Sequence, residues 1–253
     1  MERNDAPIAY RAQEAVATIT LNDPERRNAL STRLIAELRA ALAKAVADPE
    51  TRVIVIDHAG PVFSAGADLK ESAAASGLAD LPAAHLAEAL ADIAEAPKPV
   101  VVVARGAARG GGLGLIAAAD VAICSDEAEM AFSEVRLGVV PAVIGPVVAR
   151  RIGPARMRQL FLTGFKFTGE DAEEWGLVDF APYELDDAVE ETVAELIEGG
   201  PSAQTGIKVL TATPDLRGEL RRAAAVTAEY FFSEEGREGI RSFIEKRPPS
   251  WVG

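Results

Sequence analysis

Two uninterrupted apolar runs constrain the fold of this chain most strongly. Residues 53–56 (VIVI) and 100–103 (VVVV) contain only β-branched apolar side chains. Such runs are typical of strands buried on both faces, as in a parallel sheet covered by helices. Residues 15–21 and 121–124 give two further strand patterns. Between the strand patterns at residues 15–21 and 53–56, leucines recur on one helical face up to about Ala47. We therefore predict an α/β fold.

The character of the chain changes near residue 185. Before this point the patterns predict four more helices, over residues 71–95, 113–119, 141–151 and 155–162. They also predict a short last strand over residues 177–179. Within the first of these, residues 73–81 are expected to form a mobile rim of a site. Beyond residue 185 only helices are expected, over residues 185–198, 202–211, 216–232 and 234–245, with a turn at Pro214. We predict a core over residues 1–190 and a helical region over residues 191–253.

Two glycine-rich segments each follow a strand pattern. They are residues 63–70 (FSAGADLK) and 106–115 (GAARGGGLGL). Glycine lets the backbone turn sharply and present its N–H groups to a ligand, and the helix that follows Gly112 adds a partial positive charge at its start. Two converging N–H groups form an oxyanion hole, which stabilises negative charge on a carbonyl oxygen. From the residues alone, a tight turn without a ligand explains the three consecutive glycines equally well.

Two carboxylates near these segments have alternative roles. Asp68 is favoured as the cap of the following helix over a catalytic acid. Glu134 stands among the apolar residues Phe132, Val135 and Leu137. Its carboxylate either pairs with a base such as Arg136 or has a raised pKa that suits it to proton transfer, and the residues alone favour the pair. Neither a dinucleotide-binding GxGxxG pattern nor a serine-hydrolase GxSxG pattern is present.

Composition excludes several classes of function. The 253 residues carry a net charge of −13, which disfavours binding to nucleic acid and to anionic membranes. The single cysteine, Cys124, lies in an apolar run and is expected to be a buried thiol, and no intrachain disulfide is possible. With His58 and His85 far apart in sequence, no zinc site is expected. Residues 1–8 show no signal peptide, and no apolar run reaches membrane-spanning length, so a cytoplasmic location is expected.

Several ordered motifs resemble the enoyl-CoA hydratase/isomerase (crotonase) superfamily over nearly the whole chain. They are residues 21–24, 28–31, 63–71, 106–112 with Asp120, 133–138, 162–164, 176–178 and 235–247. The resemblance implies a spiral of ββα turns with a C-terminal helical trimerisation region, assembled as a homotrimer or a dimer of trimers. It also implies an acyl-CoA thioester substrate, with no cofactor beyond the coenzyme A that the substrate carries.

The resemblance assigns a role to each matching residue. Ala67 and Gly111 would donate the two oxyanion N–H groups to the thioester carbonyl, and Glu134 would move protons beside it. Residues implied to bind the CoA moiety or the acyl group are Arg26, Ala65, Asp68, Leu69, Lys70, Gly110, Pro141 and, from a neighbouring subunit, Lys246.

One position departs from the family pattern. Typical hydratases carry a second glutamate where this chain has Gly114, which can act neither as acid nor as base. The ending of this glycine motif, together with residues 133–144, resembles the methylglutaconyl-CoA hydratase branch. The sequence leaves open whether another acid, such as Glu88 or Glu95, takes the place of the missing carboxylate.

Three functions follow from the resemblance. We expect hydration of a 2-enoyl-CoA, in which Glu134 activates water. The alternatives are a Δ3,Δ2-enoyl-CoA isomerase that uses Glu134 as its single proton shuttle, and an acyl-CoA-binding homologue with little activity. Binding to RNA is disfavoured by a pI of about 4.7.

Overall fold

The computed structural model describes residues 6–252. Most of the N-terminal residues that bear on a signal peptide therefore lie outside the described part. The main sheet has five strands in the order β1-β2-β3-β5-β7, and only the β1–β2 pair is antiparallel. The strands are β1 (Ile8–Gln13), β2 (Val16–Leu21), β3 (Val53–His58), β5 (Val100–Ala104) and β7 (Val121–Cys124). The predicted α/β fold with a parallel core is confirmed.

A second, smaller sheet consists of three parallel strands in the order β4-β6-β8. Its strands are β4 (Val62–Ser64), β6 (Ala107–Arg109) and β8 (Met130–Ala131). Each of them follows a strand of the main sheet directly along the chain, so β3, β5 and β7 each continue into the small sheet. The chain therefore winds through both sheets in successive turns of two strands, as the predicted ββα spiral requires.

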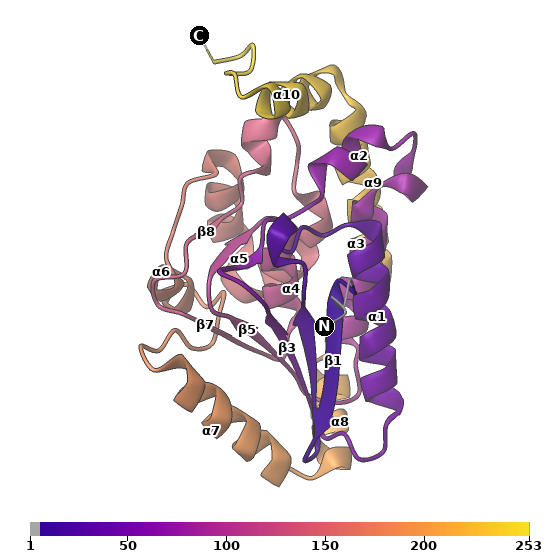
Figure 1. The fold of residues 1–253 in the computed structure, drawn as a ribbon, viewed down its shortest axis with the longest axis vertical. Coiled ribbons are helices and arrows are strands. Elements are labelled where there is room, and N and C mark those ends of the chain that lie inside the picture. Colours follow the sequence, from indigo (N-terminus) through magenta and orange to yellow (C-terminus); the bar gives the residue numbers. More distant parts are fainter. Residues whose placement is uncertain (1–5, 253) are drawn as a thin grey trace, which may run out of the picture.

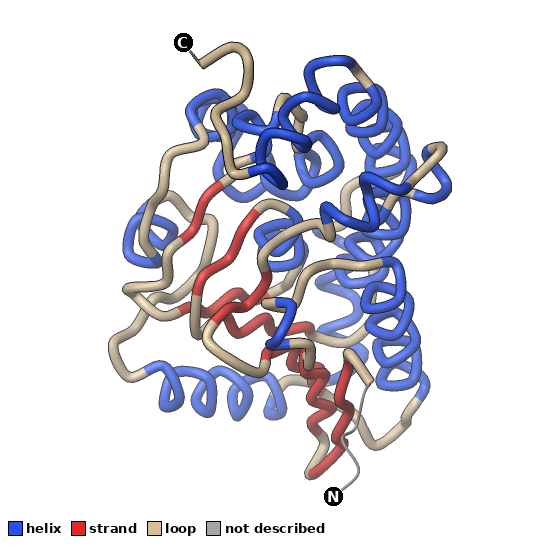
Figure 2. Tube along the Cα trace, turned by 45° about the horizontal axis from the view of Figure 1, so that its top comes forward, coloured by secondary structure: helices blue, strands red, loops and turns tan. Residues whose placement is uncertain are grey.

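Helices cover both faces of the main sheet (Figures 1 and 2). Alternate residues of β3 face opposite sides, because side chains in a strand alternate. Val53 and Val55 pack toward α7 (Leu185–Glu198), whereas Ile54 and Ile56 belong to the large core beneath α1 (Thr32–Ala47) and α3 (Pro82–Ala94). Burial on both faces explains the uninterrupted apolar runs. Every residue of α4 (Gly111–Ala118) is buried inside this core.

The remaining helices complete the molecule. They are η1 (Pro24–Arg26), α2 (Leu69–Ala74), η2 (Leu78–Asp80), η3 (Glu134–Leu137), η4 (Ala142–Ile144), α5 (Gly145–Thr163), α6 (Gly169–Glu174), α8 (Pro201–Thr211), α9 (Leu216–Phe232) and α10 (Glu234–Glu245). Only helices follow α7 among the described residues, which confirms that prediction. The α9 helix packs along α3, where Arg217 binds the carboxylates of Glu88, Asp92 and Glu95 at 2.7–2.9 Å.

Two local features of the structure differ from the sequence analysis. Strand β1 was not expected, because its hairpin turn uses Glu14 and Ala15 in left-handed conformations instead of the usual Asn-Gly or Gly-Gly pair. The predicted strand over residues 177–179 is wrong: this segment is a bend, and only Phe180 next to it forms a single bridge, to Ile123. The two helices predicted over residues 141–151 and 155–162 are confirmed as the two halves of α5, which are separated by a break at Gly153 (φ 72°, ψ 160°), although the first half begins at Gly145.

Candidate active site

The candidate site lies where the three strands of the small sheet end. Ala67 follows β4, Gly111 follows β6 and Glu134 follows β8, each within three residues of the end of its strand. Because the three strands are parallel neighbours, their carboxyl ends meet at one edge of the sheet, where ligands bind in many α/β proteins. All three residues line the same cavity. The structure therefore brings together residues that lie far apart in the sequence.

Two backbone N–H groups at this edge are available to a ligand. A bridge joins Leu30 to the Ala67 segment, in which Leu30 N donates to Gly66 O at 2.8 Å and Asp68 N donates to Leu30 O at 3.4 Å. Within residues 6–252, the N–H of Ala67 between them has no acceptor. Gly111 is the first residue of α4, where an N–H has no partner within the helix. Both residues line the same cavity, and both amides are free of a backbone acceptor within the described residues.

Glu134 has the environment of a proton-transfer group. The residue keeps some exposed surface, but its Oε2 atom is buried and has no hydrogen-bond partner among the described residues. No ion pair to Arg136, or to any other described base, compensates its charge. Burial disfavours the charged form and raises the pKa of the Glu134 carboxyl to about 7. Of the two roles left open by the sequence, the structure supports the raised pKa.

The cavity beside these groups has a volume of about 70 Å³ and an apolar wall. Glu134 is the one ionisable side chain in the wall of this described cavity, and Ser72 and Thr227 are its other polar side chains. The remaining wall residues are Leu30, Ile35, Ala67, Leu69, Leu81, Pro82, Ala83, Leu86, Gly111, Leu137, Val139, Val140, Pro141, Val143 and Phe231. The predicted residues Leu69 and Pro141 are thus part of the wall.

Part of the wall comes from α9, which sequence reasoning did not connect with the site. Thr227 and Phe231 are four residues apart and therefore lie on one helical face. The Thr227 hydroxyl accepts a hydrogen bond from Val143 N at 3.0 Å and donates one to Val140 O at 3.3 Å. The spacing of apolar residues in α9 indicates that one face of the helix is packed, but nothing in the sequence indicates which residues that face contacts.

Of the residues implied to contact CoA, Ala65, Asp68 and Lys70 flank the cavity residues Ala67 and Leu69 along the chain. Asp68 caps α2 by accepting from the N–H groups of Lys70 and Glu71, both at 3.1 Å, which confirms its predicted capping role. The buried Asp68 carboxylate also forms an ion pair with the half-exposed Arg26. Ala65 and Lys70 are exposed. Lys246 is the left-handed residue that ends α10, and it does not line the cavity.

Among residues 6–252, no second carboxylate reaches the cavity wall. Gly114 is buried in α4, and a Cβ atom at this position would lie 2.4 Å from Ile144 Cγ2. Glu88 and Glu95 bind Arg217 instead, and the hydrogen bond from Arg221, followed by that from Arg217, lowers the pKa of Glu88. Neither glutamate therefore takes the place of the missing acid in this structure.

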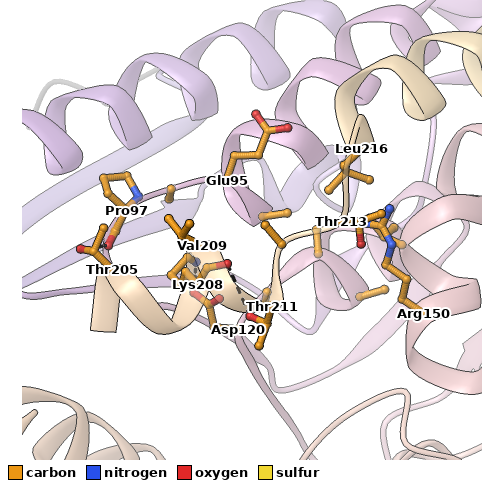
Figure 3. A pocket seen from close by; sticks show the side chains of 17 residues that line it. Glu95, Pro97, Asp120, Arg150, Thr205, Lys208, Val209, Thr211, Thr213 and Leu216 are labelled. Atoms are coloured by element: carbon orange, nitrogen blue, oxygen red, sulfur yellow. Dashed lines mark hydrogen bonds and ion pairs between the residues drawn. The ribbon is translucent and has the colours of Figure 1, made fainter. Parts of the chain in front are cut away.

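A larger cleft of about 330 Å³ lies beneath α8, and two of its charged side chains, Lys208 and Asp120, pair with each other (Figure 3). Lys208 forms an ion pair with Asp120, whose carboxylate also accepts from Val100 N at 2.8 Å. Burial raises the pKa of Asp120 despite this pairing. These bonds fasten α8 to the main sheet, so Asp120 has a structural role.

No described helix is long and apolar enough to cross a membrane.

Comparison with known proteins places the chain in a family. The model of the enoyl-CoA hydratase/isomerase family matches residues 11–253. A carnitinyl-CoA dehydratase of Salmonella arizonae is 35% identical over 94% of this chain and 95% of its own. The crystal structure of an enoyl-CoA hydratase from Mycobacterium avium is 36% identical, with a TM-score of 0.89 over 98% of this chain and 100% of the other. The chain therefore belongs to the enoyl-CoA hydratase/isomerase family.

Proposed function

We propose that this protein adds water across the C2=C3 double bond of a 2-enoyl-CoA thioester. The observation that carries the proposal is that Ala67, Gly111 and Glu134 line one cavity at one edge of the small sheet. Support also comes from relatives over 30% identical, among them an enoyl-CoA hydratase of known structure.

The mechanism follows from these three groups. The thioester oxygen accepts hydrogen bonds from Ala67 and Gly111, each worth roughly 2.7–4 kcal/mol in the transition state. Ionised Glu134 takes a proton from water while the water oxygen bonds to C3, and the electron pair of the double bond moves to the thioester oxygen. The protonated carboxyl of Glu134 then delivers its proton to C2 as the carbonyl reforms. Water is consumed, and Glu134 returns to its ionised form.

A pKa of about 7 suits Glu134 to both steps. The carboxyl must accept a proton and then release it, which is fastest when its pKa lies near the working pH. Desolvation by the apolar wall supplies this pKa without a neighbouring charge. One group can thus serve in turn as base and as acid.

The wall of the cavity favours an uncharged, apolar acyl group. A carboxylate at the far end of the acyl chain would be buried without a cationic partner, since no Lys, Arg or His lines the described cavity. A glutaconyl group carries such a carboxylate. We therefore propose that this protein shares the glycine pattern of the methylglutaconyl-CoA hydratase branch but not a dicarboxylic substrate.

The CoA moiety is assigned to the outer edge of the site. Lys70 lies three residues after Ala67 in the sequence, Arg26 is paired with Asp68 beside Ala67, and both cations keep exposed surface for phosphate binding. We propose that Ala65, Asp68 and Leu69 shape the entrance, and that Lys246 acts from a neighbouring subunit of a homotrimer or dimer of trimers. The helical region over residues 191–253 would form these subunit contacts, although Thr227 and Phe231 also line the cavity.

Isomerisation of a 3-enoyl-CoA to a 2-enoyl-CoA is the second candidate. It is favoured by one observation, namely that Glu134 is the lone ionisable side chain in the described cavity wall. Isomerisation needs only one base, which takes a proton from C2 and returns it to C4.

A panel of three substrates tests these assignments. Crotonyl-CoA should lose its conjugated-thioester absorbance in the presence of the protein. Glutaconyl-CoA should react at least about 100-fold more slowly in kcat/KM, because an unpaired buried charge costs several kcal/mol. A preference for glutaconyl-CoA would contradict the proposed acyl group. Turnover of 3-hexenoyl-CoA without hydration of crotonyl-CoA would establish the isomerase instead.

A further inference from the structure

Ile144 packs against the face of α4 that carries Gly114 and, one helical turn earlier, the candidate oxyanion residue Gly111. Gly114 lies three residues after Gly111, so the two positions share one helical face. Side chains of a helix tilt toward its N-terminus, and a side chain at 114 would therefore extend toward Gly111. An ideal Cβ at 114 would lie 2.4 Å from Ile144 Cγ2, 3.1 Å from Ile144 Cβ and 3.5 Å from Leu90 Cδ1. Even a methyl group at 114 collides with Ile144.

The position of Ile144 is held from several sides. Ile144 is 1% exposed, and Leu90 beside it is fully buried. The η4 turn that ends at Ile144 is anchored by the hydrogen bond from Val143 N to Thr227 Oγ1 at 3.0 Å. Because protein interiors are densely packed, Ile144 cannot withdraw without displacing its neighbours. The space next to Gly114 is therefore filled, not vacant.

We propose that Ile144 determines that this site works with one carboxylate, because it occupies the space that any side chain at position 114 needs. The mechanistic half of this inference rests on the proposed function of Glu134. Its structural consequence is independent of catalysis: Gly114 and Ile144 form a coupled pair, and an acid at 114 requires a smaller residue at 144.

Thermal unfolding tests, without reference to activity, whether Ile144 excludes a side chain at position 114. Gly114→Ala should lower the Tm by several degrees, although Gly→Ala inside a helix ordinarily stabilises. The matched control is Gly206→Ala in α8, where an added Cβ meets nothing within 4 Å; this variant should keep or raise the Tm. Ile144→Ala removes the colliding Cγ2, so Gly114→Ala should cost much less in that background. Ile144→Val retains Cγ2 and should give no such relief.

Hydration of crotonyl-CoA tests the mechanistic half. Gly114→Glu alone, or with Ile144→Val, should misfold or lose activity. Gly114→Glu combined with Ile144→Ala should have a kcat at least tenfold above that of Ile144→Ala alone, because a positioned acid–base group contributes about 10²–10⁴-fold.

Two results would overturn the proposal. One is an equal effect of Gly114→Ala on the Tm in the wild-type and Ile144→Ala backgrounds. The other is a folded Gly114→Glu/Ile144→Ala protein that hydrates no faster than Ile144→Ala. If no variant and no wild-type protein hydrates crotonyl-CoA, the proposed function fails by itself, and the Tm comparison still decides whether Ile144 excludes a side chain at 114.

Discussion

The carboxylate of Glu134 lies directly against the α-carbon of Gly110. A Cβ atom at Gly110 would lie 2.2 Å from Glu134 Oε1 and 2.9 Å from Glu134 Cδ. Gly110 also has a φ of 45° and a ψ of −113°, a conformation that residues with a side chain avoid. The glycine thus lets the carboxylate stand beside the first amide of α4.

Replacing Gly110 by alanine should displace the carboxylate. We expect Gly110→Ala to lower kcat for crotonyl-CoA at least about 100-fold, because small misplacements of a reacting group have effects of this size. The matched control is Gly145→Ala, since a Cβ there meets nothing within 4 Å and its φ of −51° is ordinary. Steady-state kinetics of both variants provide the measurement. Equal activity of the two would remove Gly110 from the positioning of Glu134.

The rate should depend on pH through the ionisation of Glu134. Only the ionised carboxylate can accept a proton from water, and burial raises its pKa to about 7. The kcat/KM for crotonyl-CoA should therefore rise as the pH increases through about 7 and level off above it. A profile measured from pH 5.5 to 9 checks this, and a flat profile would show that Glu134 does not titrate in this range.

Glu134 should also reduce the stability of the protein at high pH. Its pKa is 4.5 in an unperturbed chain and about 7 when folded, so the folded state loses stability as pH rises from about 4.5 to about 7. At pH 8, Glu134→Gln should be more stable than the wild type by up to about 3 kcal/mol. Urea unfolding at pH 8 and 5.5 should show a smaller difference at pH 5.5. An equal difference at both pH values would mean that the carboxylate charge is not the cause.

Thr227 should maintain the shape of the cavity wall. Its hydroxyl binds both Val143 N and Val140 O, so Thr227→Val leaves a buried N–H without a partner at a cost of about 1–3 kcal/mol. We expect this variant to raise KM for crotonyl-CoA and lower the Tm. Thr227→Ser keeps the hydroxyl and should restore KM. If the serine variant is as impaired as the valine variant, the hydrogen bonds are not what holds the wall.

The sequence predicts those parts of the fold that burial determines. The runs at β3 and β5 are apolar throughout because helices cover both faces of the sheet. Strand β1 was missed because it is a largely exposed edge strand with an unusual turn at Glu14 and Ala15. Segment 177–179 resembles a strand because Leu177 and Val178 belong to the core although they lie in a bend, and the local pattern cannot separate that case from a short strand.

The candidate site was predictable in its residues but not in its packing. Resemblance to a family identified Ala67, Gly111 and Glu134 together, whereas the residues alone favoured an ion pair for Glu134. Whether a carboxylate is paired depends on residues distant in sequence. In the same way, the close approach of Gly114 in α4 and Ile144 in η4 depends on how two elements pack, and the sequence of neither element predicts it.

The central claim is that Glu134 carries the proton transfers of this site, and one comparison tests it most directly. Purified wild-type protein and Glu134→Gln are mixed with crotonyl-CoA, and the loss of conjugated-thioester absorbance is followed, while calorimetry measures binding of the saturated analogue butyryl-CoA. We predict hydration by the wild type, loss of at least about 10²-fold in kcat for the variant, and similar binding by both. Hydration by Glu134→Gln at the wild-type rate would contradict the account.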